Sequence, residues 1–133
     1  MNPAFADTSY LVALHSSYDS LHDLANEFGK IYLNDLVTTE YVLVETSNFF
    51  SKPFARQLFG KFAQKLRAHH DVRILPSLSD LFNRGLALFE ARPDKKWSLT
   101  DCISFVVMDD LGLAEALTAD HHFEQAGFVA LLT

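Results

Sequence analysis

Apolar residues follow two alternating patterns along the chain, and together they predict an α/β fold. Short apolar runs, which are typical of buried strands, fall at residues 3–6, 31–38, 71–75, 114–119 and 128–132. Between them, apolar residues recur at helical spacing, which predicts helices over residues 8–14, 20–28, 39–50, 54–69, 78–91, 98–110 and 121–126. Because strands and helices alternate, we expect a three-layer sandwich in which a central, mostly parallel sheet is flanked by helices.

Local signals mark where several of these helices begin and end. Gly29 is placed to end the second helix, and Pro93 to stop the helix over residues 78–91. Ser98 and Asp101 have the spacing of a capping box at a helix start. The residues that follow are apolar almost all round, so we expect this helix to be buried and Asp101 to lie at the edge of the core.

Length and composition suit a globular domain. The chain has 133 residues, of which 49% are hydrophobic and 21% charged, and we expect residues 1–133 to form a single domain. No apolar run reaches the roughly 18–20 residues of a spanning helix, so no membrane contact is expected. The N-terminal residues lack the basic and apolar segments of a secretory signal. The single cysteine, Cys102, excludes an intrachain disulfide. We therefore expect a cytoplasmic protein.

Charge is distributed unevenly along the sequence. The formal net charge is −6, which by itself argues against binding of a polyanion. Residues 51–75, however, contain six lysines and arginines and a single acid, whereas the first 50 residues contain seven acids and one base. This asymmetry predicts a basic patch beside an acidic pocket. The alternative is a long exposed helix with a solvated basic face.

Four acidic residues stand at or near the ends of predicted elements. Asp7 and Asp120 each follow a predicted strand, and ligands of a parallel sheet bind beyond the carboxyl ends of its strands. Glu45 and Asp101 lie on helices that can cover the same edge. Carboxylates brought together repel one another unless cations compensate them, and oxygen ligands select hard divalent ions such as Mg2+ or Mn2+. Such ions suit phosphodiester hydrolysis, because they lower the pKa of a bound water and offset charge on the phosphate.

Each of the four acids lies in a short segment that can be compared with known families: FADTSYLVAL, VLVETSNFF, WSLTDCISFVVM and ALTADHHFEQAGF. In this order they resemble the PIN-domain family, most closely its VapC-type toxin ribonucleases of type II toxin–antitoxin systems. The resemblance implies a PIN-like fold and a Mg2+- or Mn2+-dependent endoribonuclease, in which a metal-activated water is held by Asp7, Glu45, Asp101 and Asp120. It also implies that nearby hydroxyls orient water or metal, namely those of Thr8, Ser9 and Thr118. The implied partners are an RNA substrate, a cognate antitoxin and a second copy of the chain in a homodimer.

Basic and aromatic residues offer candidate contacts for such partners. Arg56 and Lys65 are placed to guide an RNA backbone, and His121 or His122, which follow Asp120, can touch a substrate phosphate. Five of the 12 phenylalanines fall within residues 49–62. They either pack in the core or form an apolar groove or dimer surface that accepts an antitoxin segment.

Each acid also has a purely structural interpretation. Asp7 and Asp120 can cap the helices that follow them, and Asp101 can merely complete its capping box. Glu45 can pair with a buried lysine or arginine. If these interpretations hold, the chain is a catalytically silent PIN-like module that works through protein contacts. The adjacent histidines at 69–70 and 121–122 do not share a helix face, so surface positions are expected for them rather than metal ligation.

Overall fold

Strands and helices alternate along the chain, as the apolar pattern predicts. The computed structural model describes residues 3–32 and 35–133. In chain order its elements are β1 Ala4–Ala6, α1 Thr8–His15, α2 His22–Tyr32, β2 Leu36–Thr39, α3 Glu40–Ser47, the 3-10 turn η1 Asn48–Phe50, α4 Pro53–Ala68, β3 Val72–Leu75, α5 Ser79–Ala91, α6 Leu99–Leu111, β4 Glu115–Leu117, α7 His121–Gln125 and β5 Val129–Ala130.

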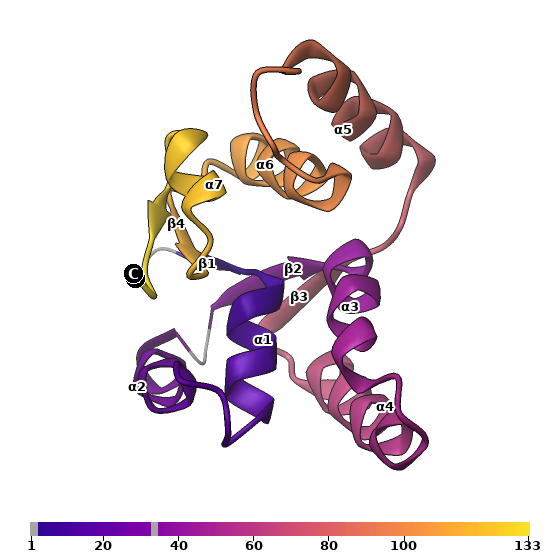
Figure 1. Cartoon of the computed structure of the whole chain (residues 1–133), viewed down its shortest axis with the longest axis vertical. Coiled ribbons are helices and arrows are strands. Elements are labelled where there is room, and N and C mark those ends of the chain that lie inside the picture. The colour runs from indigo at the N-terminus through magenta and orange to yellow at the C-terminus, as the bar shows by residue number, and fades with distance from the viewer. Residues whose placement is uncertain (1–2, 33–34) are drawn as a thin grey trace.

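The five described strands form one sheet in the order β3-β2-β1-β4-β5, and each neighbouring pair is parallel. Helices α5, α6 and α7 lie on one side of the sheet and α1, α2 and α4 on the other, which confirms the three-layer prediction (Figure 1). From β1 the chain first builds outward through β2 and β3, and it later adds β4 and β5 on the opposite side of β1. The order of strands therefore reverses between β1 and β4, and the carboxyl edge at such a switch point is where parallel sheets bind ligands.

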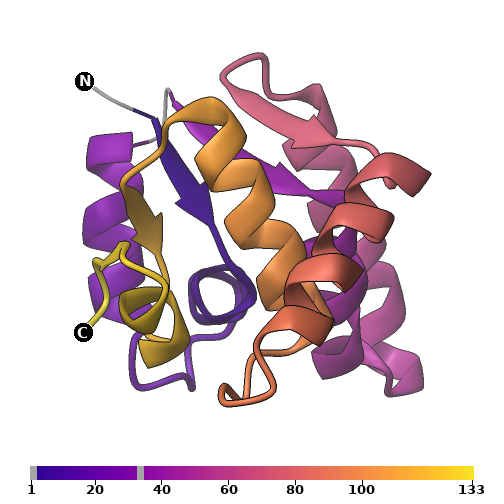
Figure 2. The ribbon, with the colours of Figure 1, turned by 90° about the horizontal axis from the view of Figure 1, so that it is seen from above.

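Helix α6 provides much of the core on its side of the sheet. Figure 2 shows it running beside the strands, with α5 packed against its outer side. The predicted capping box is present, because the Asp101 N–H donates to Ser98 Oγ over 3.0 Å and the Ser98 N–H donates to Asp101 Oδ2 over 3.1 Å. Its aromatic member, Phe105, is buried and meets Phe123 edge-on at 4.9 Å between ring centroids. The helix ends at Gly112, whose left-handed φ of 67° is the conformation that glycine adopts without a Cβ clash.

The second helix departs from its predicted end. Gly29 does not stop it, because α2 continues to Tyr32. A Cβ at Gly29 would meet Tyr10 Oη at 3.2 Å, so the glycine allows α1 and α2 to approach closely. The strand predicted over residues 31–38 begins only at Leu36, and residues 33–34 of that prediction lie outside the described residues.

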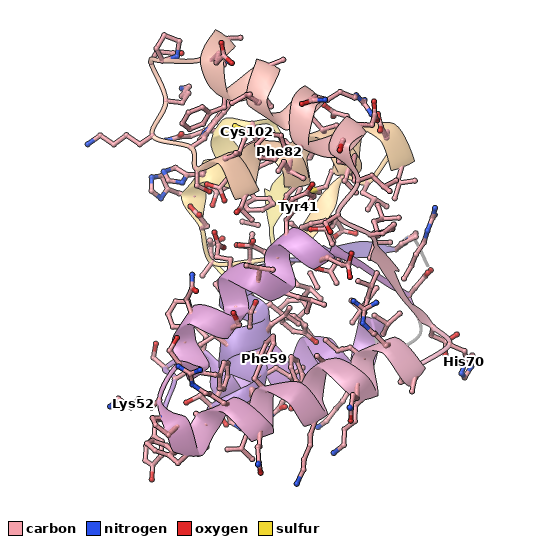
Figure 3. The ribbon with its side chains drawn as sticks, turned by 90° about the vertical axis from the view of Figure 1, so that its right-hand side faces the viewer. Tyr41, Lys52, Phe59, His70, Phe82 and Cys102 are labelled. Carbon is pink, nitrogen blue, oxygen red and sulfur yellow. The ribbon has the colours of Figure 1, made fainter. Side chains whose placement is uncertain are left out.

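The phenylalanine-rich segment, residues 49–62, is partly in the core and partly exposed. Phe59 and Phe62 pack against the core, and Figure 3 shows Phe59 on α4 pointing toward the rest of the molecule. Phe54 is 77% exposed and Phe49 is 64% exposed, so the amino-terminal part of the segment presents aromatic rings to solvent. Within the two described ranges, no helix is long and apolar enough to cross a membrane.

A matched pair of glycine substitutions tests the packing of α5 against α6. A Cβ at Gly85 would lie 2.3 Å from Ile103 Cγ1, whereas a Cβ at Gly60, on α4, would meet nothing within 4 Å. Chemical denaturation should show that Gly85→Ala lowers the free energy of unfolding by about 1–3 kcal/mol through overpacking. Gly60→Ala should leave it unchanged or raise it by up to about 1 kcal/mol, since alanine is the better helix former. A Gly85→Ala protein as stable as the parent would contradict the close approach of the two helices.

Candidate active site

Asp7 directly follows β1 at the switch point. Its backbone N–H donates to Leu117 O over 3.2 Å, which ties it to the end of β4. The side chain is only 4% exposed, and Asp7 Oδ2 accepts a 2.8 Å hydrogen bond from Thr118 Oγ1. Asp7 Oδ1 is buried and has no hydrogen-bond partner among the described residues. Because buried polar atoms are nearly always paired, an orphaned carboxylate oxygen fits the coordination of a cation.

The three predicted hydroxyls form two separate arrangements, one at Asp7 and one at Glu45. Thr118 Oγ1 gives its hydrogen to Asp7 and accepts the Asp120 N–H over 3.0 Å. Ser9 Oγ lies 3.1 Å from Thr118 Oγ1 and accepts the Ala119 N–H over 3.0 Å. Because the single Thr118 hydroxyl hydrogen is donated to Asp7, Ser9 is the donor to Thr118. These bonds fasten the start of α1 to the end of β4. Thr8 instead turns to α3, where its hydroxyl donates to Glu45 Oε1 over 2.5 Å.

The four acids interact electrostatically, although they come from four parts of the chain. Burial raises the pKa of Asp7 to about 7, and the neighbouring charges of Asp101 and Glu45 add to that rise. Burial also raises the pKa of Asp101, and the charges of Asp120 and Glu45 raise it further. The charges of Glu45, Asp101 and Asp120 therefore act on the carboxyl group of Asp7 or of Asp101. The structure brings all four predicted acids together.

Basic side chains do not neutralise this cluster. In the part of the chain that the structure describes, the ion pairs made by Asp101 and Asp120 are with histidines, and no lysine or arginine nitrogen lies within 4.0 Å of any of the four carboxylates. The alternative in which Glu45 pairs with a buried base is therefore not observed. Burying unpaired carboxylates is costly, and a divalent ion would remove that cost.

Two acids do have the structural roles that were considered for them. Asp120 caps α7, because its Oδ1 accepts the His122 N–H over 2.9 Å. Asp101 completes the capping box of α6, whereas the Asp7 side chain makes no cap bond to α1. A carboxylate has about four acceptor sites on two oxygens, so one cap bond leaves Asp101 and Asp120 free to bind an ion as well.

Three of the four acids, Asp7, Glu45 and Asp120, line one cleft, and a second cleft adjoins it. The first has a volume of about 350 Å³ and is lined by acidic residues and hydroxyls: Asp7, Glu45, Asp120, Thr8, Ser9 and Asp19. The second has a volume of about 700 Å³ and shares Val12 and Phe49 with the first. Tyr18 and Phe54 also line the second cleft, and both are more than three-quarters exposed. We call this second one the aromatic cleft.

The predicted substrate contacts are placed less uniformly. Arg56 is exposed on α4, and its Nε donates to the carbonyl of Ser51, a residue that lines the aromatic cleft. Lys65 lines a different cleft together with Leu36 and Val72, the first residues of β2 and β3. Lys65 therefore lies toward the amino edge of the sheet, away from the acids, and the structure does not bring it to the site.

His122, rather than His121, faces the acids. The His121 side chain is 72% exposed and its Nδ1 lies 3.8 Å from Asp120 Oδ1. The His122 side chain is 21% exposed, and its Nδ1 lies 3.3 Å from Asp101 Oδ2 and 3.2 Å from Asp120 Oδ1. The sequence indicates that only one of these two histidines can face the acids, because neighbouring residues that follow an N-cap point in different directions. It does not indicate which of the two turns inward.

Comparison with known proteins agrees with this geometry. The sequence model of the PIN domain matches residues 4–129. The chain is 27% identical over 125 residues to the 23S rRNA-specific endonuclease VapC20 of Mycobacterium tuberculosis, in two strains, covering 94% of this chain and 95% of that protein. The crystal structure of VapC20 from the same organism, described as a Sarcin-Ricin loop cleaving toxin, superposes with a TM-score of 0.85 at 26% identity, covering 95% of this chain and 96% of that one. The resemblance drawn from the four sequence segments is confirmed, and the chain belongs to the PIN domain family.

Proposed function

We propose that the protein is a toxin of the VapC type, a divalent-metal-dependent endoribonuclease formed by a single PIN-like domain over residues 1–133. The observation that carries the proposal is the unneutralised cluster of four carboxylates at the switch point, with a buried Asp7 oxygen that has no partner in the described chain. Similarity to an endonuclease over nearly the whole length supports the same conclusion.

The carboxylates would hold Mg2+ or Mn2+ through Asp7, Glu45, Asp101 and Asp120. The ion, when bound, lowers the pKa of a water molecule and offsets the negative charge that develops on a phosphate under attack. The chain's own contribution is orientation. Thr118 fixes the Asp7 carboxylate through Oδ2 and leaves Oδ1 without a partner among the described residues, and Thr8 fixes Glu45 through Oε1 from α1. Only side-chain oxygens of fixed geometry are then needed, and no nucleophilic side chain is required.

The similarity also suggests the substrate and the partners. VapC20 is described as specific for 23S rRNA and as cleaving its Sarcin-Ricin loop, and we propose a structured ribosomal RNA loop as the target class here. The aromatic cleft, with exposed Phe49 and Phe54, is the surface we assign to an amphipathic segment of a cognate antitoxin. A homodimer is proposed from the family resemblance alone. Such an enzyme would meet its substrate in the cytoplasm.

Removal of individual carboxylates tests the catalytic assignment. Asp7→Asn and Asp101→Asn should each reduce Mn2+- or Mg2+-dependent RNA cleavage by at least about 100-fold, because they remove a ligand and not merely a supporting group. Asp109→Asn is the matched control, since Asp109 is an exposed acid on the same helix as Asp101. Gel-resolved cleavage of ribosomal RNA measures the effect, and circular dichroism checks the fold. Full activity in both site variants would refute the assignment and favour a catalytically silent module.

The raised pKa of Asp7 predicts how stability depends on pH. In the folded protein this pKa is about 7, above its ordinary value of 3.8, so ionisation of Asp7 between about pH 4 and about pH 7 destabilises the metal-free fold. With chelator present, the free energy of unfolding should fall by about 1–3 kcal/mol more in the wild type than in Asp7→Asn between about pH 5 and about pH 8. Comparing the two slopes cancels the pH-independent cost of the buried amide.

Saturating Mn2+ should restore stability to the wild type at the higher pH and do little for Asp7→Asn. Urea denaturation of both proteins, at each pH with chelator and at the higher pH with Mn2+, measures these changes. Equal slopes for the two proteins would show that Asp7 ionises in the fold without penalty, and would remove the electrostatic case for a cation at this position.

Charge reversal on α4 tests the path of the RNA. Arg56→Glu should weaken RNA cleavage several-fold and reduce its salt dependence, because Arg56 lies beside the aromatic cleft that adjoins the acids. Lys65→Glu, a similar change on the same helix, should have a smaller effect because Lys65 lies toward the opposite edge of the sheet. The measurement is the RNA concentration for half-maximal cleavage at two salt concentrations. A larger effect from Lys65 would place the RNA across the other cleft.

A further inference from the structure

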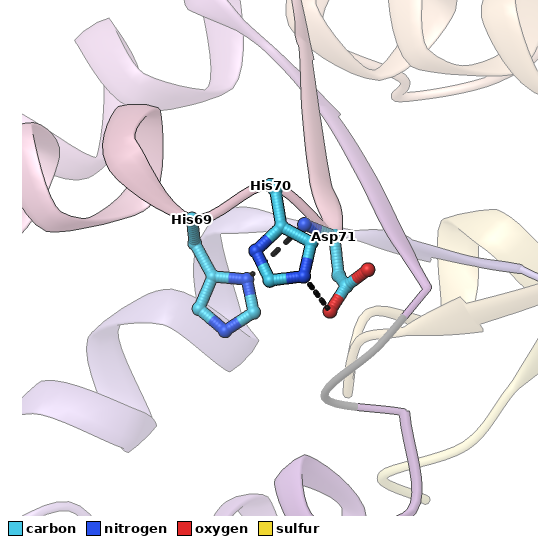
Figure 4. A group of neighbouring side chains, drawn as sticks. All are labelled: His69, His70 and Asp71. Atoms are coloured by element: carbon cyan, nitrogen blue, oxygen red, sulfur yellow. Dashed lines mark hydrogen bonds and ion pairs between the residues drawn. The ribbon is translucent and has the colours of Figure 1, made fainter.

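Two groups of neighbouring histidines and aspartates occur in the described part of the chain. Each places three ligand atoms within 4.8 Å of one another. The first, His69–His70–Asp71, lies where α4 leads into β3 (Figure 4), and its His70 side chain is 88% exposed. Among the described residues, no histidine, cysteine or acid from another element belongs to this group. The second, Asp120–His121–His122, lies against the acid cluster and includes a contact to α6, so it is the one with a wider chemical context.

The His122 imidazole is held between two of the acids. Its Nδ1 is 3.3 Å from Asp101 Oδ2 and 3.2 Å from Asp120 Oδ1. Its backbone is fixed as well, because the His122 N–H donates to Asp120 Oδ1 over 2.9 Å. The next residue, Phe123, is completely buried and anchors α7 in the core against Phe105. The position of the ring is therefore determined by the fold and not by a freely moving surface side chain.

The two distances from His122 Nδ1 to the carboxylate oxygens match the spacing of neighbouring ligands around one ion. Two ligands each roughly 2.0–2.2 Å from an ion stand about 2.8–3.6 Å apart when the angle between them is about 90–109°. Both distances from His122 Nδ1 fall in that interval. The same distances would also suit a protonated imidazole that donates to the carboxylates. The two possibilities predict opposite effects of removing the ring, because a ligand strengthens metal binding and a positive charge in the same pocket weakens it.

We propose that His122 is a nitrogen ligand of the acid cluster, binding through Nδ1 beside Asp101 and Asp120, and that it biases the site toward first-row transition ions over Mg2+. The inference rests on the proposed function and deepens it. Imidazole nitrogen is a softer donor than carboxylate oxygen and suits transition ions, whereas Mg2+ prefers oxygen and water. Mn2+ is the ion of this series that a carboxylate-rich site also favours, so it serves as the probe.

The experiment measures metal binding by the full chain, apart from any activity. Pulsed electron paramagnetic resonance of bound Mn2+ detects the nuclear spin of a directly coordinated nitrogen. The wild type should show this coupling, isotopic labelling of histidine should shift it, and His122→Ala should lose it. The matched control is His70→Ala, which removes an imidazole from the other histidine group and should keep the coupling. Calorimetry should show Mn2+ affinity about tenfold weaker in His122→Ala, with Mg2+ affinity nearly unchanged.

The outcomes separate this inference from the proposed function. If Asp7→Asn weakens Mn2+ binding but the wild type shows no nitrogen coupling, the acid site stands and the role of His122 is overturned. Tighter binding of both ions to His122→Ala would also overturn it, and would identify the ring as a competing cation. If Asp7→Asn does not affect Mn2+ binding at all, the metal site of the proposed function fails, and the His122 inference fails with it. If His122→Ala folds poorly, the absence of nitrogen coupling from the wild type still overturns the role of His122, and a coupling that is present is assigned with His122→Gln in its place.

Discussion

The buried carboxylate of Asp7 is the constraint on which the site depends. One of its oxygens is held by Thr118, the other has no partner in the described chain, and burial raises its pKa to about 7. A sequence selected for stability alone would not leave an acid in this state, since replacing it would remove the cost of ionisation. The sheet supplies the position, because the strand order reverses between β1 and β4 and their ends meet there. The remaining acids arrive on elements that cover the same edge.

Much of the fold could be predicted from apolar periodicity, because the central strands β1, β2 and β4 are short and largely buried and several helices have a recognisable start or stop. The capping box of Ser98 and Asp101 is a local signal and was read correctly. Gly29 was misjudged as a helix end, since its reason for being glycine is the nearby Tyr10 on another helix. Likewise, the regular spacing on α4 did not reveal that Phe54 is left exposed. Contacts between distant elements decide both features, and no local pattern encodes them.

The site divides in the same way. Asp7 and Asp120 could be predicted because strand ends in a parallel sheet share one edge, and the family resemblance indicated Glu45 and Asp101, which lie on helices, and the hydroxyls. The roles of the hydroxyls required coordinates: Thr118 holds Asp7, whereas Thr8 holds Glu45. Sequence reasoning placed His121 or His122, together with Lys65, among the substrate contacts. The structure turns His122 inward and places Lys65 near the starts of β2 and β3. The rotation of α7 about its axis decides which histidine faces the acids, and the direction of α4 decides which edge of the sheet Lys65 approaches.

The central claim is that one metal-ion site is formed by four carboxylates: Asp7 after β1, Glu45 on α3, Asp101 on α6 and Asp120 after β4. Crystals soaked in Mn2+ and measured near the manganese absorption edge test it directly, because anomalous scattering locates the ion without assumptions about its ligands. The account predicts a strong peak within about 2.0–2.4 Å of Asp7 Oδ1 and in contact with Asp101. Peaks only at surface groups such as His69–His70–Asp71, with none beside Asp7, would contradict it.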